Sequence, residues 1–108
     1  MTSNGRYVYL LRTSEDGIYK IGIAKNVEKR VKQLQTGNDD VIAVVEKFFS
    51  EYPFKVESAL HRRYTTDNIK GEWFYLTNDQ VSSFVSDCTT LEQGFKTMDL
   101  FENPFFNK

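Results

Sequence analysis

Residues 18–34, which read IYKIGIAKNVEKRVKQL, constrain the fold more than any other part of the chain. The apolar residues of 18–23 alternate at the two-residue period of a strand, whereas those of 27–34 recur at helical spacing. Asn26 stands where the period changes and belongs to the residue types preferred as helix N-caps. The stretch therefore predicts a strand that leads through a capped turn into a helix with one apolar side.

The residues just before this strand predict its partner. Residues 7–12 are mostly aromatic, β-branched or aliphatic, and residues 13–17 form a polar turn sequence that ends in glycine. We expect a hairpin of two antiparallel strands. Period-two alternation places Tyr9 and Lys20 on the same side of this hairpin, opposite the side that faces the core.

The middle of the chain continues with alternating elements. Residues 41–49 are rich in valine and phenylalanine and predict a third strand. Pro53 is suited to the first turn of a second helix that extends to Tyr64. Glu57 and His61 stand four residues apart on that helix, so their side chains share one flank.

The C-terminal part is read as a loop, a short extended segment and two helical segments. Residues 68–71 predict the loop, and the aromatic segment 72–76 is expected to be extended. A third helix should end near Cys88, with a further helical segment at 91–98 after a break. We therefore expect an α+β domain with a small, mostly antiparallel three-stranded sheet flanked by helices. Residues 1–90 would form the domain, and 91–108 a C-terminal helical and aromatic extension of it.

Composition bounds the environment and the partners. A chain of 108 residues with 40% hydrophobic residues suits one compact core. Its single cysteine excludes an intrachain disulfide, and no apolar run approaches the roughly 20 residues that span a bilayer. We therefore expect a soluble cytoplasmic protein with no membrane partner. The net charge is −1, yet residues 20–32 contain five basic residues and one acidic residue, which predicts a local cationic surface.

Several short motifs resemble the GIY-YIG nuclease family. They are Tyr7-Val8-Tyr9, Lys20-Ile21-Gly22, Arg30 and Glu57, and their spacing agrees without a gap. Residues 56–61 and 71–74 are similar to the small phage, viral and fungal branch of that family. Two positions depart from its pattern, because Tyr7 replaces a glycine and Lys20 replaces a tyrosine. Tyr19 lies one residue before that tyrosine position and faces the other side of the strand.

The resemblance implies a metal-dependent endonuclease that hydrolyses DNA phosphodiester bonds. Glu57 would hold Mg²⁺ or Mn²⁺, since hard cations favour carboxylate oxygens. Tyr9 would activate the attacking water, and Arg30 would bind the scissile phosphate. The expected catalytic residues are Tyr9, Lys20, Arg30, Glu57, His61 and Tyr19. The expected DNA-binding residues are Lys25, Lys29, Arg30 and Lys32, and Glu72 is a candidate supporting or metal-binding residue.

Two other functions remain open from the sequence. Lys20 in place of tyrosine is compatible with a catalytically inactive nucleic-acid-binding module that keeps the basic surface. The acidic, phenylalanine-rich C-terminal part is compatible with a protein-interaction or regulatory module. Because 108 residues leave no room for a separate DNA-recognition domain, we expect specificity to come from the catalytic domain itself, from a homodimer or from a targeting partner protein.

Overall fold

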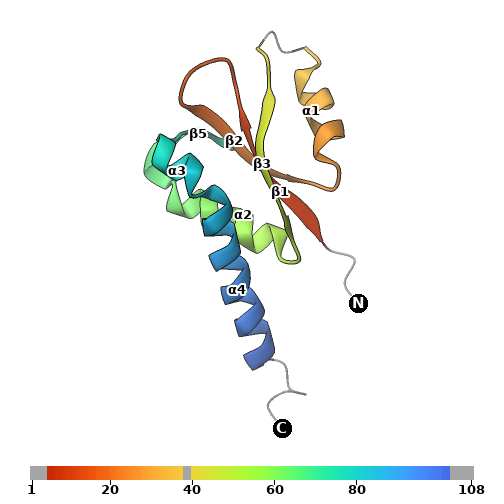
Figure 1. Ribbon diagram of the computed structural model, residues 1–108, viewed down its shortest axis with the longest axis vertical. Coiled ribbons are helices and arrows are strands. Elements are labelled where there is room, and N and C mark those ends of the chain that lie inside the picture. The colour runs from red at the N-terminus through yellow and green to blue at the C-terminus, as the bar shows by residue number, and fades with distance from the viewer. Residues whose placement is uncertain (1–4, 38–39, 103–108) are drawn as a thin grey trace.

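A computed structural model describes residues 5–37 and 40–102 (Figure 1). The elements in chain order are β1 (Arg6–Arg12), β2 (Ile18–Ala24), α1 (Val27–Gln35), β3 (Ala43–Ser50), α2 (Pro53–Arg63), a 3₁₀ turn (Thr65–Asp67), β4 (Asn68–Lys70), β5 (Trp73–Tyr75), α3 (Asn78–Ser82) and α4 (Phe84–Glu102). The α+β class is confirmed. No helix in the described part of the chain is long and apolar enough to cross a bilayer.

The sheet has five strands in the order β3-β1-β2-β5-β4, and every neighbouring pair is antiparallel. The three expected strands are present as β1, β2 and β3, and the expected helices before and after β3 are present as α1 and α2. The expected total of three strands is wrong, because the sheet has five. The segment read as a loop forms β4, and β5 pairs with the outer edge of β2. Strands of three residues are too short to display an alternating pattern, so backbone pairing defines them: β5 pairs with β2, and β4 pairs with β5.

The sheet lies between two helical layers (Figure 1). On one face, α1 covers a small core formed by Tyr9, Leu11, Val27 and Ile42. On the other face, α2 and α4 cover the larger core, whose buried residues are Val8, Leu10, Ile21, Val56, Leu60, Tyr64, Phe74, Leu76, Phe84 and Cys88. The hairpin register opposes Tyr9 to Gly22 and Leu11 to Lys20, so these four residues share the α1 face.

The helix ends follow local sequence signals. Asn26 caps α1, and its side chain accepts a hydrogen bond from the Lys29 backbone N–H at 2.9 Å. Pro53 opens α2 as expected. The expected break after Cys88 is wrong, because α4 runs without interruption from Phe84, and the break falls at Ser83.

A buried carboxylate fastens α4 to the turn between β3 and α2. Glu92 Oε1 accepts a hydrogen bond from the Ser50 hydroxyl at 2.5 Å, and Oε2 accepts one from the Glu51 backbone N–H at 2.9 Å. Ser50 and Glu92 are both buried. This contact, together with the apolar residues of α4, fixes the start of α2 and thereby the helix that carries Glu57 and His61.

Candidate functional site

Tyr9 reaches the edge of β2 because the facing residue has no side chain. Its ring lies over Gly22 on the neighbouring strand, where a Cβ would stand 2.5 Å from the Tyr9 hydroxyl oxygen and 2.7 Å from Cζ. Any side chain at this position would force the ring to move. The glycine therefore lets a buried tyrosine extend its hydroxyl across a whole strand.

The outer edge of β2 has no neighbouring strand beyond Ile21. Pairing between β2 and β5 ends at Lys20 and Trp73, after which the Ile21 N–H donates to the Glu72 carbonyl at 3.1 Å. The Ile21 carbonyl oxygen lies 3.1 Å from His61 Nε2. Helix α2 packs on the face of the sheet opposite α1. Its side chains therefore reach residues of the α1 face by passing around this edge of β2.

Lys20 is held at the edge by two neighbours. Its Nζ lies 2.9 Å from Glu72 Oε1 and 5.1 Å from the centroid of the Trp73 ring. Only 10% of the lysine side chain is exposed, so an anionic partner is needed to offset the loss of hydration. The structure thus presents a mostly buried cation on the same face of the hairpin as Tyr9.

Glu57 enters the site from α2 and interacts with Glu72. Burial raises the pKa of Glu57, and the negative charge and hydrogen bond of Glu72 raise it further. His61 and Lys20 act in the opposite direction, and His61 Nε2 lies 3.8 Å from Glu57 Oε2. Because the Glu72 charge disfavours the ionised form of Glu57, the two carboxyl groups favour a proton or a cation between them.

Arg30 approaches the same hydroxyl from α1. Burial raises the pKa of Tyr9, and the negative charges of Glu72 and Glu57 raise it further. A hydrogen bond from Arg30 to the hydroxyl, together with its positive charge, opposes this shift. Tyr9 is consequently a neutral phenol near pH 7.

Of the sequence-predicted site residues, the structure brings six together at the open edge of β2. They are Tyr9, Lys20, Arg30, Glu57, His61 and Glu72, which we call the edge site. Tyr19 is not among them, because it packs against the core on the α2 face. The candidate DNA-binding residues Lys25, Lys29 and Lys32 are exposed at the turn before α1 and along it.

Sequence reasoning missed one contributor to this arrangement, Trp73, which provides an aromatic face for Lys20. Gly22, which provides the space that Tyr9 occupies, was accessible from the sequence, since a glycine inside a strand pattern often marks a close approach. The role of Trp73 depends on pairing between β5 and β2, which short strands do not reveal.

Comparison with family models gives one match, the T5orf172 domain, over residues 6–89. The match covers all the elements that build the edge site and more than half of the chain. The chain belongs to the T5orf172 domain family. This is a phage-type family of nuclease-like and DNA-binding modules, which indicates a role with nucleic acid. Comparisons with curated proteins and with solved structures give no match.

This result corrects the assignment suggested by the short motifs. The T5orf172 domain is a different family from GIY-YIG, so the expected GIY-YIG membership is wrong. The resemblance rested on a few positions, of which Tyr7 and Lys20 already departed from the GIY-YIG pattern. The geometry of the edge site stands independently of that assignment.

Proposed function

We propose that this T5orf172 protein is a divalent-metal-dependent endonuclease that hydrolyses DNA phosphodiester bonds at the edge site. The supporting observation is the convergence of a phenol, two cations and a carboxylate pair at one open strand edge. A phosphodiester needs positive charge near its oxygens and an oriented water for hydrolysis. Family membership supports a nucleic-acid substrate.

The carboxylate pair fits a divalent cation of the Mg²⁺ type. Glu57 would hold the ion, with Glu72 as the second carboxylate. Within residues 5–37 and 40–102 there is no group of three or more His, Cys, Asp or Glu that could hold a metal. This suits Mg²⁺ or Mn²⁺ bound through one or two carboxylates, with water and substrate oxygens as other ligands. When bound, such an ion supplies charge neutralisation for the phosphate and a more acidic water.

The two cations position the substrate. Arg30 presents a planar guanidinium that can donate two parallel hydrogen bonds to a phosphate. Lys20 adds a point charge that is fixed by Glu72 and Trp73. Because both groups are held by neighbours before DNA arrives, little reorganisation is needed when negative charge develops on the phosphate.

Tyr9 acts as a neutral hydrogen-bonding group in this proposal. Its hydroxyl lies near the Arg30 side chain, and as a neutral phenol it can donate its proton in a hydrogen bond to a phosphate oxygen or to the attacking water's oxygen. The raised pKa argues against a phenolate that removes a proton near pH 7. Tyr9 therefore orients a reacting oxygen rather than serving as the base.

His61 has a positioning role. The Ile21 carbonyl can only accept a hydrogen bond, so the Nε2 atom that faces it at 3.1 Å must carry the hydrogen. The imidazole also packs edge-on against Phe74, with ring centroids 5.0 Å apart. These contacts orient His61 beside Glu57 and leave Nε2 unable to accept a proton.

The test is cleavage of supercoiled, linear and branched DNA in Mg²⁺, in Mn²⁺ and in EDTA. We expect cleavage only with metal, and a loss of about 100-fold or more in Glu57→Gln and in Arg30→Gln. Glu46→Gln is the matched control for Glu57→Gln, because it removes the same charge from an exposed position on β3. Circular dichroism establishes that each variant is folded. Equal cleavage in EDTA, or full activity in Glu57→Gln, would contradict the proposal.

A second candidate function is DNA binding without cleavage. The observation that favours it is the ion pair between Lys20 and Glu72, which already neutralises this cation in the absence of DNA. It predicts salt-dependent binding that Arg30→Gln weakens and Glu57→Gln leaves unchanged, with intact DNA in every metal. The same set of variants separates the two functions.

A further inference from the structure

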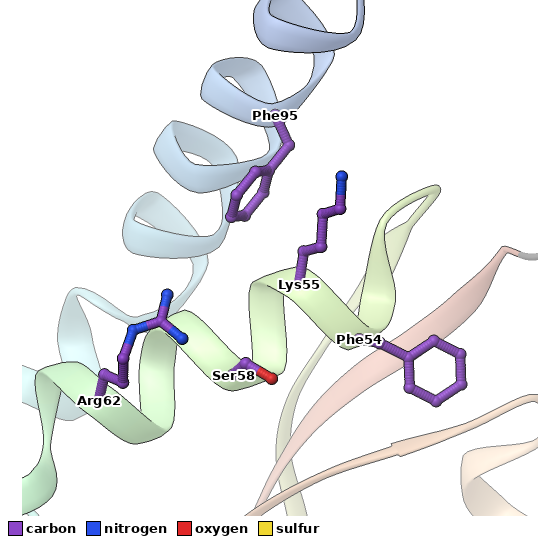
Figure 2. Close-up of a pocket in the computed structure, with 5 residues that line it drawn as sticks. All are labelled: Phe54, Lys55, Ser58, Arg62 and Phe95. Carbon is purple, nitrogen blue, oxygen red and sulfur yellow. The ribbon is translucent and has the colours of Figure 1, made fainter.

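A groove of about 260 Å³ lies between α2 and α4, on the side of the sheet opposite α1. It is lined by Phe54, Lys55, Ser58, Arg62 and Phe95 (Figure 2). Four of these residues come from α2, and Phe95 extends toward them from α4 (Figure 2). We call it the α2–α4 groove.

Two cations border this groove without an acidic partner. In the part of the chain that the structure describes, neither Lys55 nor Arg62 pairs with a carboxylate. By contrast, the next residue, Arg63, is bound to Asp87 at 3.0 Å. The groove lining contains no acidic residue. Its charge is therefore available to an anion from solution.

The neighbouring acidic residues of α4 are engaged elsewhere. Asp87 accepts a hydrogen bond from Tyr64 as well as the ion pair from Arg63. Glu92 is buried against Ser50, and Asp99 accepts a hydrogen bond from the Tyr52 hydroxyl at 3.2 Å. These contacts keep their negative charges bound to partners other than Lys55 and Arg62.

Aromatic and hydroxyl groups complete the groove. Phe54 is 60% exposed, and Lys55 Nζ lies 5.8 Å from the centroid of the Phe95 ring. Ser58 is exposed and stands on α2 between the two cations (Figure 2). Lys55 and Arg62 are seven residues apart, which corresponds to about 10 Å along the helix axis. Cations, a hydroxyl and aromatic rings together suit an extended ligand that carries both phosphates and bases.

The groove also adjoins the edge site around α2. Successive residues of an α-helix are rotated by about 100°, so Ser58 and Arg62 follow Glu57 and His61 directly around the helix surface. Glu57 and His61 face the open edge of β2, whereas Ser58 and Arg62 face the groove. A chain that leaves the edge site across α2 would enter the α2–α4 groove.

We infer that the α2–α4 groove binds backbone phosphates of the DNA strand that flanks the site of cleavage. Arg62 and Lys55 donate charged hydrogen bonds to the phosphate oxygens, and Ser58 donates a neutral one. The inference rests on the proposed function for its ligand. It adds that DNA is held on two sides of α2, with the scissile bond at the edge site and the flanking strand in the groove.

The test measures binding of fluorescent DNA in EDTA by anisotropy, over a range of salt concentrations. The variant is Lys55→Gln/Arg62→Gln, and its matched control is Arg12→Gln/Lys70→Gln, which removes one exposed arginine and one exposed lysine elsewhere. We expect affinity about tenfold weaker in the groove variant, with the salt slope reduced by about 1 to 2, and a change below about twofold in the control.

The other outcomes contradict the inference, the proposed endonuclease activity or both. An equal loss of DNA affinity in both double variants would indicate general electrostatic attraction. If the wild type did not bind DNA at all, DNA would not be the ligand of the groove. Unchanged DNA binding, with an altered sedimentation profile in the groove variant, would assign the groove to contact between two copies of this chain. If the wild type cleaves DNA and the groove substitutions do not change DNA affinity, only the inference is refuted. Groove-dependent binding without cleavage refutes only the endonuclease.

Discussion

Tyr9 lies so close to Gly22 that a Cβ on the glycine would stand 2.5 Å from the tyrosine hydroxyl oxygen. The two residues are directly paired on β1 and β2, and the absence of a side chain on one allows the ring of the other to cross the strand. The Tyr9 hydroxyl can therefore reach the edge site only because Gly22 has no side chain.

Gly22→Ala should displace the Tyr9 ring from the edge site. We expect a loss of cleavage of about 100-fold, because displacement of a reacting group by about 1 Å has effects of this size. Overpacking should also lower the free energy of unfolding by about 1–3 kcal/mol, as measured by urea denaturation. Ala24→Gly, at another residue of β2, is a control for general changes in the strand. Full cleavage activity in Gly22→Ala would show that the position of Tyr9 is not needed.

Glu57→Gln should change the pH dependence of stability. Burial and Glu72 raise the pKa of Glu57 above its ordinary value of 4.5 in the folded protein. The folded state then binds this proton more tightly than the unfolded chain, so the resulting stability is full below that ordinary value and is lost as pH rises through the raised pKa. The free energy of unfolding of wild type should fall relative to Glu57→Gln over this range.

Denaturation of both proteins at several pH values, with and without Mg²⁺, measures this difference. A bound cation would replace the proton. At pH values above the raised pKa of Glu57, Mg²⁺ should therefore raise the melting temperature of wild type and leave the melting temperature of Glu57→Gln unchanged. A pH-independent difference between the two proteins would show that Glu57 has an unperturbed pKa.

Glu72→Gln should remove the ion pair that holds the Lys20 side chain in place. The variant removes the negative charge 2.9 Å from a lysine whose side chain is 10% exposed. We expect lower stability from Glu72→Gln alone and a smaller effect of the same change in a Lys20→Met background, with a coupling energy of about 0.5–3 kcal/mol. Urea denaturation of the four proteins measures it. Strictly additive effects would mean that the ion pair contributes nothing to the fold.

Glu92→Ala should loosen α4 from the turn that begins α2. It leaves the buried Ser50 hydroxyl and the Glu51 backbone N–H without their acceptor. The expected cost is about 1–3 kcal/mol for each group left unsatisfied, read from thermal or urea denaturation. Gln93→Ala, at the next residue of α4, is the control, because its side chain is exposed and of similar size. Stability equal to that of the control would contradict a structural role for Glu92.

Local sequence signals were sufficient for the first half of the fold. The hairpin, the Asn26 cap, α1, β3 and α2 each depend on periodicity or on turn chemistry within a few residues. The same alternation placed Tyr9 and Lys20 on one face, which the register confirms, but the expectation that this face lies away from the core is wrong, because α1 covers a second core there. Local patterns predicted that 72–76 is extended, as β5 is, but missed β4, a three-residue strand that is defined by its pairing with β5.

The roles of individual site residues were less accessible from the sequence. Spacing alone grouped Tyr9 with Arg30 and Glu57, but it also included Tyr19, which packs into the core on the other face. It gave no account of the Lys20 contact with Trp73, because that contact crosses between strands 53 residues apart in the chain.

The sequence by itself determined the strand, turn and helix that place Lys20 and Arg30, because these depend on forces between near neighbours. It also determined which residues of each strand share a face, since side chains alternate between faces. Only the tertiary structure decided that β2 extends past β5 and that Glu57 can reach Tyr9 around this open edge. Such an arrangement depends on where strands stop pairing and on how helices pack on opposite faces. Both are set by contacts between residues that are distant in the chain.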